Sequence, residues 1–127
     1  MQFSILSDPA NLKTARKNLA NFIHQNQIKL KDEGNVILAV DEAVQNVIRY
    51  AYGMDTKQPI DFEFQYNNHD LVIKIRDYGK QVPLENIKSR ELEDVKPGGL
   101  GVYFIKSISK SLQFEHQDKG TLLTLVF

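Results

Sequence analysis

The sequence contains no cysteine, and this absence excludes several classes of protein. Disulfide frameworks, zinc–thiolate sites and cysteine nucleophiles all require that side chain. The absence suits a cytoplasmic protein, because disulfides are rare in that compartment. A chain of 127 residues fits one domain, expected here over residues 1–127. A domain of this size buries enough surface to fold without cross-links.

Net charge and long apolar runs are also lacking. Sixteen Lys and Arg residues balance sixteen Asp and Glu residues. Neutralised phosphates supply much of the affinity for nucleic acid, so this chain is not expected to bind nucleic acid directly. No apolar run reaches the roughly 20 residues of a membrane-spanning helix. Gln2–Ser7 alternates polar and apolar residues like a strand, so a signal peptide is not expected either.

Hydrophobic periodicity predicts eight elements in the order β-α-α-β-β-α-β-β. The predicted helices cover about 9–27, 35–52 and 100–111, and the predicted strands cover 2–7, 60–66, 71–77, 112–117 and 121–127. Asp8 followed by Pro9 is typical of a helix start, and Gly53 of a helix end. Because the strands come mainly as hairpins, the expected fold class is α/β. We expect a two-layer α/β sandwich with a mostly antiparallel sheet and the helices on one face.

Glu42 and Asn46 are four residues apart on the second predicted helix, so their side chains share one face. Asparagine is a mediocre helix former, costing about half a kcal/mol relative to alanine. A polar pair at this spacing is compatible with a binding site. Taken alone, such a pair more often belongs to an ordinary solvated helix face.

Asp77-Tyr78-Gly79 follows a predicted strand. An aspartate in this position can hydrogen-bond the edge of a base, and the glycine allows close approach of the backbone. The same tripeptide is also common in ordinary turns that end a strand. Taken alone, it does not distinguish the two.

Gly98-Gly99-Leu100-Gly101 precedes the third predicted helix. Glycines at a helix start leave backbone N–H groups facing an anion, which the helix dipole also favours. The spacing matches neither the dinucleotide fingerprint nor the P-loop. A hinge without a ligand is the alternative. Thr121, after Gly120, could likewise contact a ligand or only stabilise its turn.

The combination is more specific than its parts. Four motifs occur in one order, namely Glu42-x-x-x-Asn46, Asp77-x-Gly79, Gly99-x-Gly101 and Gly120-Thr121. This resembles the GHKL ATPase superfamily, whose ATP-binding fold is of the Bergerat type and which includes gyrase, mismatch-repair ATPases and histidine kinases. The stretches 40–53 and 98–110 are most similar to the small anti-sigma-factor serine kinases of bacteria.

The resemblance implies a role for each motif. Asn46 would coordinate Mg²⁺, and Glu42 would be the catalytic general base. Asp77 would accept a hydrogen bond from the adenine amino group of ATP or ADP, with Gly79 and Thr121 completing that end. The N–H groups of Gly99, Leu100 and Gly101 would contact the phosphates. Residues 80–98 would form a mobile lid.

Two positions depart from the family pattern. Tyr50 stands where histidine is common, and Gln81 stands where a second glycine often follows Asp-x-Gly. Neither departure removes the base or the metal ligand. Arg49 is not part of the family motif and is expected to lie in solvent.

The resemblance also implies partners. Kinases of this type phosphorylate a serine or threonine of a small antagonist protein with a STAS-type fold, and many bind a sigma factor. They are commonly homodimers, and Gln2–Ser7 is a candidate edge strand for pairing.

Three functions remain open on the sequence alone. The chain could be an ATP-dependent serine/threonine protein kinase, a switch that senses ATP or ADP without phosphoryl transfer, or the ATPase domain of a larger machine. Retention of Glu42 favours the kinase, because a pure binder needs no base. The sequence has no eukaryotic kinase signature, which argues against a eukaryotic-type protein kinase. It has no phosphoacceptor-histidine helix before the domain, which argues against a complete histidine kinase.

Overall fold

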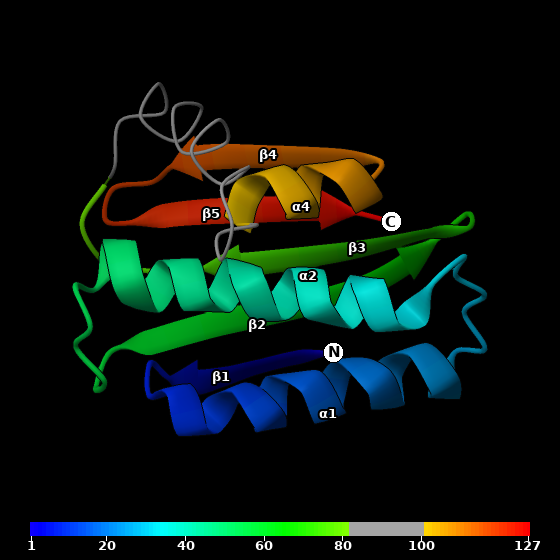
Figure 1. Ribbon diagram of the computed structural model, residues 1–127, viewed down its shortest axis with the longest axis horizontal. Helices are drawn as coiled ribbons and strands as arrows, with labels where there is room; N and C mark the ends of the chain where they lie inside the picture. The colour runs from blue at the N-terminus through cyan, green and yellow to red at the C-terminus, as the bar shows by residue number, and fades with distance from the viewer. Residues whose placement is uncertain (82–100) are drawn as a thin grey trace.

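Alternating apolar side chains form a five-stranded sheet in the computed structural model, which describes residues 1–81 and 101–127 (Figure 1). The strands are β1 (Gln2–Leu6), β2 (Pro59–Asn67), β3 (Asp70–Arg76), β4 (Ser111–His116) and β5 (Thr121–Val126). Their order is β1-β2-β3-β5-β4, and every neighbouring pair is antiparallel.

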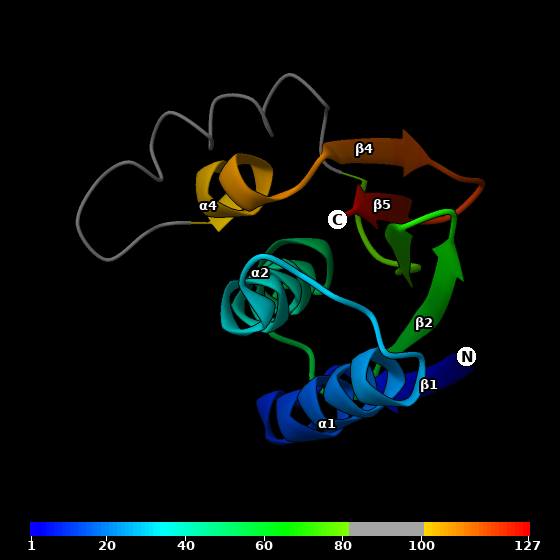
Figure 2. The same cartoon turned by 90° about the vertical axis from the view of Figure 1, so that its right-hand side faces the viewer.

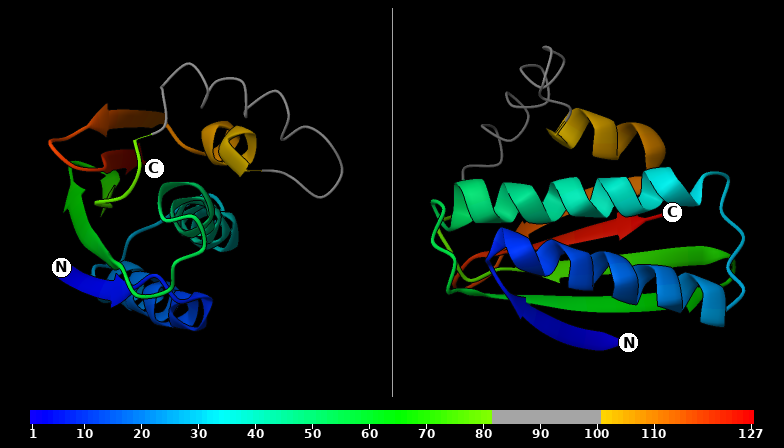
Figure 3. Two further views of the ribbon diagram at one scale, coloured as in Figure 1. Left: turned by 90° about the vertical axis from the view of Figure 1, so that its left-hand side faces the viewer. Right: turned by 60° about the horizontal axis from the view of Figure 1, so that its bottom comes forward.

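The helices of the described residues all cover one face of this sheet. They are α1 (Leu12–Gln25), α2 (Glu33–Asn46) and α4 (Gly101–Ile108), and α2 packs between the other two. Figure 2 views the two layers along the strands, and the left panel of Figure 3 shows them from the opposite end. The predicted fold class, a two-layer α/β sandwich with a mostly antiparallel sheet, is therefore confirmed.

The hydrophobic core fills the space between the layers. In β2 and β3 the buried positions alternate, as the sequence pattern requires. An aromatic cluster closes the side near β1, where the rings of Phe3 and Phe62 stack with centroids 4.7 Å apart. The large side chains with least exposure come from both layers: Leu19, Ile23, Val44, Ile60, Phe64, Leu71, Ile73, Ile75, Ile105 and Leu125.

Helix starts follow the expected capping chemistry. The carboxylate of Asp8 accepts a hydrogen bond from the N–H of Ala10 at 2.9 Å, and Pro9 opens a single 3₁₀ turn before α1. Asp32 caps α2 by accepting from the N–H of Asn35 at 3.1 Å. The β2–β3 hairpin turns through Asn68 and His69, which both have positive φ, as a two-residue hairpin turn requires.

The element boundaries differ from the sequence prediction in two informative places. The second helix was expected to continue to residue 52, but α2 ends at Asn46 and a π-helical turn follows over Val47–Ala51. Gly53, at φ +54°, then ends this turn. The third helix is shorter than predicted, because Ser111 already pairs with Val126 as the first residue of β4. No helix within 1–81 and 101–127 is long and apolar enough to cross a membrane.

Gly120 is required by close packing as well as by its backbone conformation. Its φ is +70°, and a Cβ atom here would lie 2.0 Å from the carbonyl oxygen of Asp77. Gly53 has a similar φ of +54°, but a Cβ atom there would meet nothing within 4 Å. A side chain at Gly53 would therefore cause backbone strain alone, whereas a side chain at Gly120 would cause both strain and steric overlap.

We predict that Gly120→Ala destabilises the fold far more than Gly53→Ala. Both variants place alanine in the left-handed region, which costs about 1–2 kcal/mol. Gly120→Ala must in addition move the backbone of Asp77 or of the β4–β5 turn. Urea unfolding measures both free energies, and equal losses in the two variants would show that the overlap is relieved without cost.

Candidate functional site

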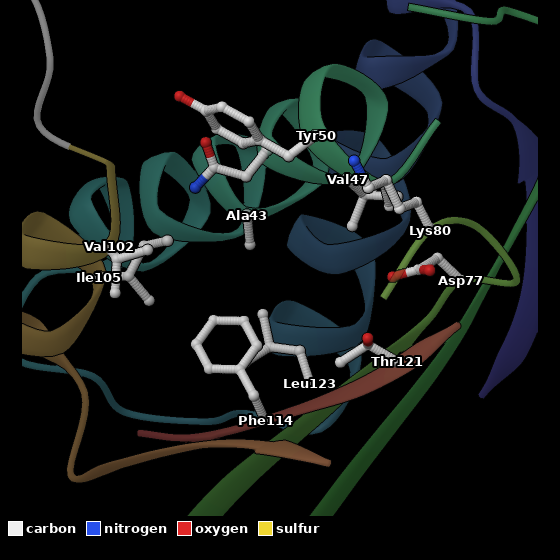
Figure 4. A pocket seen from close by; sticks show the side chains of 12 residues that line it. Ala43, Val47, Tyr50, Asp77, Lys80, Val102, Ile105, Phe114, Thr121 and Leu123 are labelled. Carbon is white, nitrogen blue, oxygen red and sulfur yellow. The ribbon is translucent and has the colours of Figure 1, made fainter. Parts of the chain in front are cut away.

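A cavity opens between α2 and the strands β4 and β5 (Figure 4). The space inside it that a water-sized molecule can occupy is about 50 Å³, and its mouth is open to solvent. Apolar side chains form most of its wall, with few polar groups among them. The lining residues are Ala43, Asn46, Val47, Tyr50, Ala51, Asp77, Lys80, Val102, Ile105, Phe114, Thr121 and Leu123.

Asp77 is a buried acid directly after β3, and 4% of its surface is exposed. Its carboxylate points into the cavity in Figure 4. One carboxylate oxygen accepts a hydrogen bond from the N–H of Gly79 at 3.0 Å. A carboxylate has lone pairs for further donors, so Asp77 can accept a hydrogen bond from a ligand in the cavity.

Burial raises the pKa of Asp77 above its ordinary value. Hydrogen bonds from the backbone of Gly79 and Thr121, and the positive charges of Arg76 and His116, oppose this shift without cancelling it. The charged carboxylate is therefore less stable in the folded protein than in water. A buried acid with a shifted pKa in a cleft is typical of a functional group.

Two glycines bring backbone segments close to Asp77. A Cβ atom on Gly79 would lie 2.4 Å from the carbonyl oxygen of Ala51, and the contact of Gly120 with Asp77 is tighter still. The N–H of Asp77 donates to the carbonyl of Thr121 at 3.0 Å, so Asp77 and Thr121 adjoin at the same end of the cavity. The structure thus brings together Asp77, Gly79 and Thr121, as the sequence motifs predict for one site.

The end of the π-helical turn supports the Asp77–Gly79 turn from the α2 side. The carbonyl of Ala51 accepts from the N–H of Lys80 at 2.8 Å. The hydroxyl of Tyr52 accepts from the N–H of Tyr78 at 2.8 Å and donates to the carbonyl of Pro59. Burial is the main reason that the pKa of the Tyr52 hydroxyl is raised, which keeps it protonated as a donor.

Helix α2 presents Asn46 to the cavity, and Glu42 lies next to Asn46 on the same helix face. Each residue of an α-helix advances by about 100°, so Ala43 and Asn46 of α2 lie on one stripe, and Tyr50 of the following π-helical turn lines the same cavity. Glu42 lies at the outer edge of this stripe, is half-buried, and is not among the described residues that line the cavity. The two residues share a helix face as predicted, but only Asn46 reaches the cavity.

The glycine-rich motif is only partly described. Gly99 and Leu100 lie outside the described residues, as do residues 82–98 of the expected lid. Gly101 is the first residue of α4, and Val102 and Ile105 of that helix line the cavity. The start of α4 therefore adjoins the cavity, as the expected phosphate-binding role of Gly101 requires.

Several residues that line the cavity were not predicted from the sequence to contact a ligand. Tyr50, a residue that is 38% exposed, lines the cavity, and the guanidinium of Arg49 lies 5.7 Å from the centroid of its ring. Arg49 is exposed, as expected. Lys80 and Phe114 line the cavity from the Asp77 loop and from β4. The turn at Gly120 differs from these residues, because a glycine directly before a strand is typical of a tight turn with positive φ and could be recognised in the sequence.

We predict that Asp77 makes stability fall as the pH rises. Because its pKa is higher in the folded protein than in the unfolded chain, the folded state binds more protons between the two pKa values, and unfolding releases them. The free energy of unfolding of the wild type, minus that of Asp77→Asn, should decrease from about pH 4 towards neutrality. Urea unfolding at several pH values measures this difference. An increase with pH would mean that Asp77 has a lowered pKa.

Comparison with known proteins places this geometry in a family. The family described as the histidine kinase-like ATPase domain matches residues 5–127. The chain is 22% identical over 125 residues to a serine-protein kinase RsbW of Oceanobacillus iheyensis, with 92% of this chain and 79% of that protein covered. It is 27% identical over 132 aligned positions to an anti-sigma F factor of Clostridium perfringens, with 98% and 93% covered.

The fold agrees with this assignment. A solved structure described as the SiaB–SiaC complex from Pseudomonas aeruginosa contains a similar chain, with a TM-score of 0.71 at 16% identity, over 100% of this chain and 89% of that one. At this identity the likeness concerns the fold alone. The chain belongs to the family of histidine kinase-like ATPase domains, and its resemblance to the anti-sigma-factor kinases of the GHKL superfamily is confirmed.

Proposed function

We propose that this protein is an ATP-dependent serine/threonine protein kinase. It would act as an anti-sigma-factor-type regulator in a bacterial partner-switching circuit by phosphorylating a STAS-type antagonist protein. The observation that carries this proposal is the buried carboxylate of Asp77, which faces an apolar cavity that Asn46 also lines.

The chemistry of the Asp77 end suits adenine. An apolar wall accommodates a flat aromatic ring, and the carboxylate accepts a hydrogen bond from its exocyclic amino group. Thr121 adds a hydroxyl at the same end of the cavity. Gly79 supports this end by holding one oxygen of Asp77 through its N–H. ATP and ADP share this base, so both are expected to bind.

Asn46 and the start of α4 suit the phosphates and a Mg²⁺ ion. No cluster of three or more His, Asp or Glu side chains that could hold a metal ion is present in the part of the chain that the structure describes. A single amide oxygen is sufficient here, because Mg²⁺ keeps several waters and binds nucleotide phosphates with one or two protein ligands. When bound, Mg²⁺ would neutralise phosphate charge. Gly99, Leu100 and Gly101 would offer N–H groups to the phosphates.

Glu42 is proposed as the general base. In the reaction, the hydroxyl oxygen of the partner's serine or threonine forms a bond to the γ-phosphorus, and the bond from that phosphorus to the bridging oxygen of ADP breaks. The hydroxyl proton passes to the Glu42 carboxylate. The outward position of Glu42 beside Asn46 supports this role, because a partner protein has to approach from outside the cavity.

The expected partners follow from the relatives. One relative is named a serine-protein kinase and another an anti-sigma factor, which supports a STAS-type antagonist as substrate and a sigma factor as a second partner. We also propose a homodimer that forms beside β1. This strand is an edge of the sheet, and Leu6 at its end is 52% exposed. Light scattering of the purified chain distinguishes this dimer from a monomer.

One observation favours a second candidate function. Tyr50 lines the cavity at the position where histidine is common in the family. A protein that binds ATP or ADP and releases or retains its partner without phosphoryl transfer would be compatible with this departure. The experiment below separates this switch from the kinase.

We predict that Glu42→Gln abolishes most phosphoryl transfer while ATP still binds. The substitution keeps the shape of the side chain but removes the basic carboxylate, which is typically worth a factor of about 10² to 10⁴ in rate. Asn46→Ala should weaken both binding and transfer, because it removes the proposed metal ligand. Transfer is measured with labelled ATP, Mg²⁺ and a STAS-type protein encoded nearby.

Glu33→Gln is the matched control for this experiment. Glu33 lies in the first turn of the same helix and pairs with His24 at 3.0 Å, remote from the cavity lining. This variant should transfer phosphate like the wild type. If Glu42→Gln is as fast as the wild type, Glu42 is not the base. If the wild type binds ATP and transfers nothing, the switch replaces the kinase.

A further inference from the structure

The side chain of Gln81 bridges the Asp77–Gly79 turn and the β4–β5 turn. Its amide nitrogen donates to the carbonyl of Gln117 at 2.5 Å and to the carbonyl of Gly120 at 2.9 Å. A primary amide carries two N–H donors, so it can satisfy both carbonyls at once. Glycine, which the family pattern often has at this position, offers no such side-chain donor.

The β4–β5 turn fixes how Thr121 sits relative to Asp77. The N–H of Gln117 donates to the carbonyl of Gly120 at 3.0 Å and closes the turn. Gly120 touches the backbone of Asp77 so closely that no Cβ atom would fit, and Thr121 accepts from the N–H of Asp77. Any shift of this turn therefore moves Thr121 and Asp77 relative to each other.

The turn is held from both sides of Asp77. On the β3 side, the guanidinium of Arg76 donates to the carbonyls of Lys119 at 3.0 Å and of Asp77 at 3.2 Å. On the other side, beyond Gly79, the two hydrogen bonds come from Gln81. The carboxylate of Asp77 thus lies between two anchors to the same hairpin.

We propose that Gln81 is a positioning residue that sets the base selectivity of the nucleotide site. It would fix Asp77 where an adenine amino group can donate to the carboxylate, so that guanine is rejected. This inference rests on the proposed function, because it assigns specificity to the same site. Gln81 does not line the cavity, so it acts through Asp77 and Thr121.

The physical basis is the difference between the two purines at one atom. Adenine carries an amino donor where guanine carries a carbonyl acceptor, so guanine would set an acceptor against the carboxylate. A buried polar group left without a partner costs about 1–3 kcal/mol. Guanine binding is weakened by this full amount only if the carboxylate is held so that it cannot turn away from the carbonyl or admit a water molecule between them. A loosened β4–β5 turn relieves the clash and lowers discrimination more than it lowers affinity.

The test compares the binding of ADP and GDP, each with Mg²⁺, by isothermal titration calorimetry. Gln81→Glu keeps the length of the side chain but has no N–H donor, and Gln81→Leu removes all polar atoms. In both variants the ratio of the GDP to the ADP dissociation constant should fall by a factor of about 5 to 30, the equivalent of one or two hydrogen bonds. The dissociation constant of ADP should change less than this ratio.

Gln117→Glu is the matched control, because its side chain lies in the same turn and, among the described residues, donates to the carbonyl of its neighbour Glu115 at 3.3 Å rather than across the turn. It should leave the ratio at the wild-type value. If the Gln81 variants weaken ADP and GDP by the same factor, or change neither, or if the control changes the ratio equally, the inference is overturned. If the wild type fails to bind ADP, the proposed function fails with it, which is a distinct result.

Discussion

The site depends on the close approach of two backbone segments. These segments are Asp77–Gly79 after β3 and Gly120–Thr121 at the start of β5. Neither Gly79 nor Gly120 has room for a Cβ atom, so the segments lie nearer than side chains normally permit. This proximity buries the carboxylate of Asp77 at the end of the cavity. Burial of a charged group opposes folding, and a ligand that donates a hydrogen bond offsets part of that cost, which couples nucleotide binding to stability.

Neighbouring positions of helix α2 would serve different parts of the proposed reaction, because side chains point in different directions around the helix axis. Ala43 and Asn46 of α2 line the cavity together with Tyr50 of the π-helical turn, whereas Glu42 lies beside Asn46 outside the lining. A nucleotide bound inside and a protein partner approaching from outside would meet at this position. The π-helical turn after Asn46 then brings Ala51 against Gly79 and Lys80, so the two ends of the site are joined through one continuous helix.

Sequence patterns were sufficient for the elements and for the grouping of Asp77, Gly79 and Thr121, because period-2 alternation and turn glycines reflect local physics. They could not indicate the π-helical turn, since Val47–Ala51 reads as ordinary helix, and the contact of Ala51 with Gly79 and Lys80 joins segments that only the fold brings together. The bridge from Gln81 to Gly120 was equally hidden, because it joins residues 39 apart that only the sheet brings together. The roles of Gly99 and Leu100, outside the described residues, stay predictions.

The central claim, that Asp77 receives the adenine of a bound nucleotide, is tested most directly by titrating ADP with Mg²⁺ into the wild type, Asp77→Asn and Asp70→Asn in a calorimeter. Asp70 pairs with Lys110 at the β2–β3 hairpin and does not line the cavity, so it is a matched control. The account predicts one ADP per chain in the wild type and in Asp70→Asn, and affinity at least about tenfold lower in Asp77→Asn, because a hydrogen bond to a charged group is worth about 1.5–3 kcal/mol. No binding by the wild type, or undiminished affinity in Asp77→Asn, would contradict it.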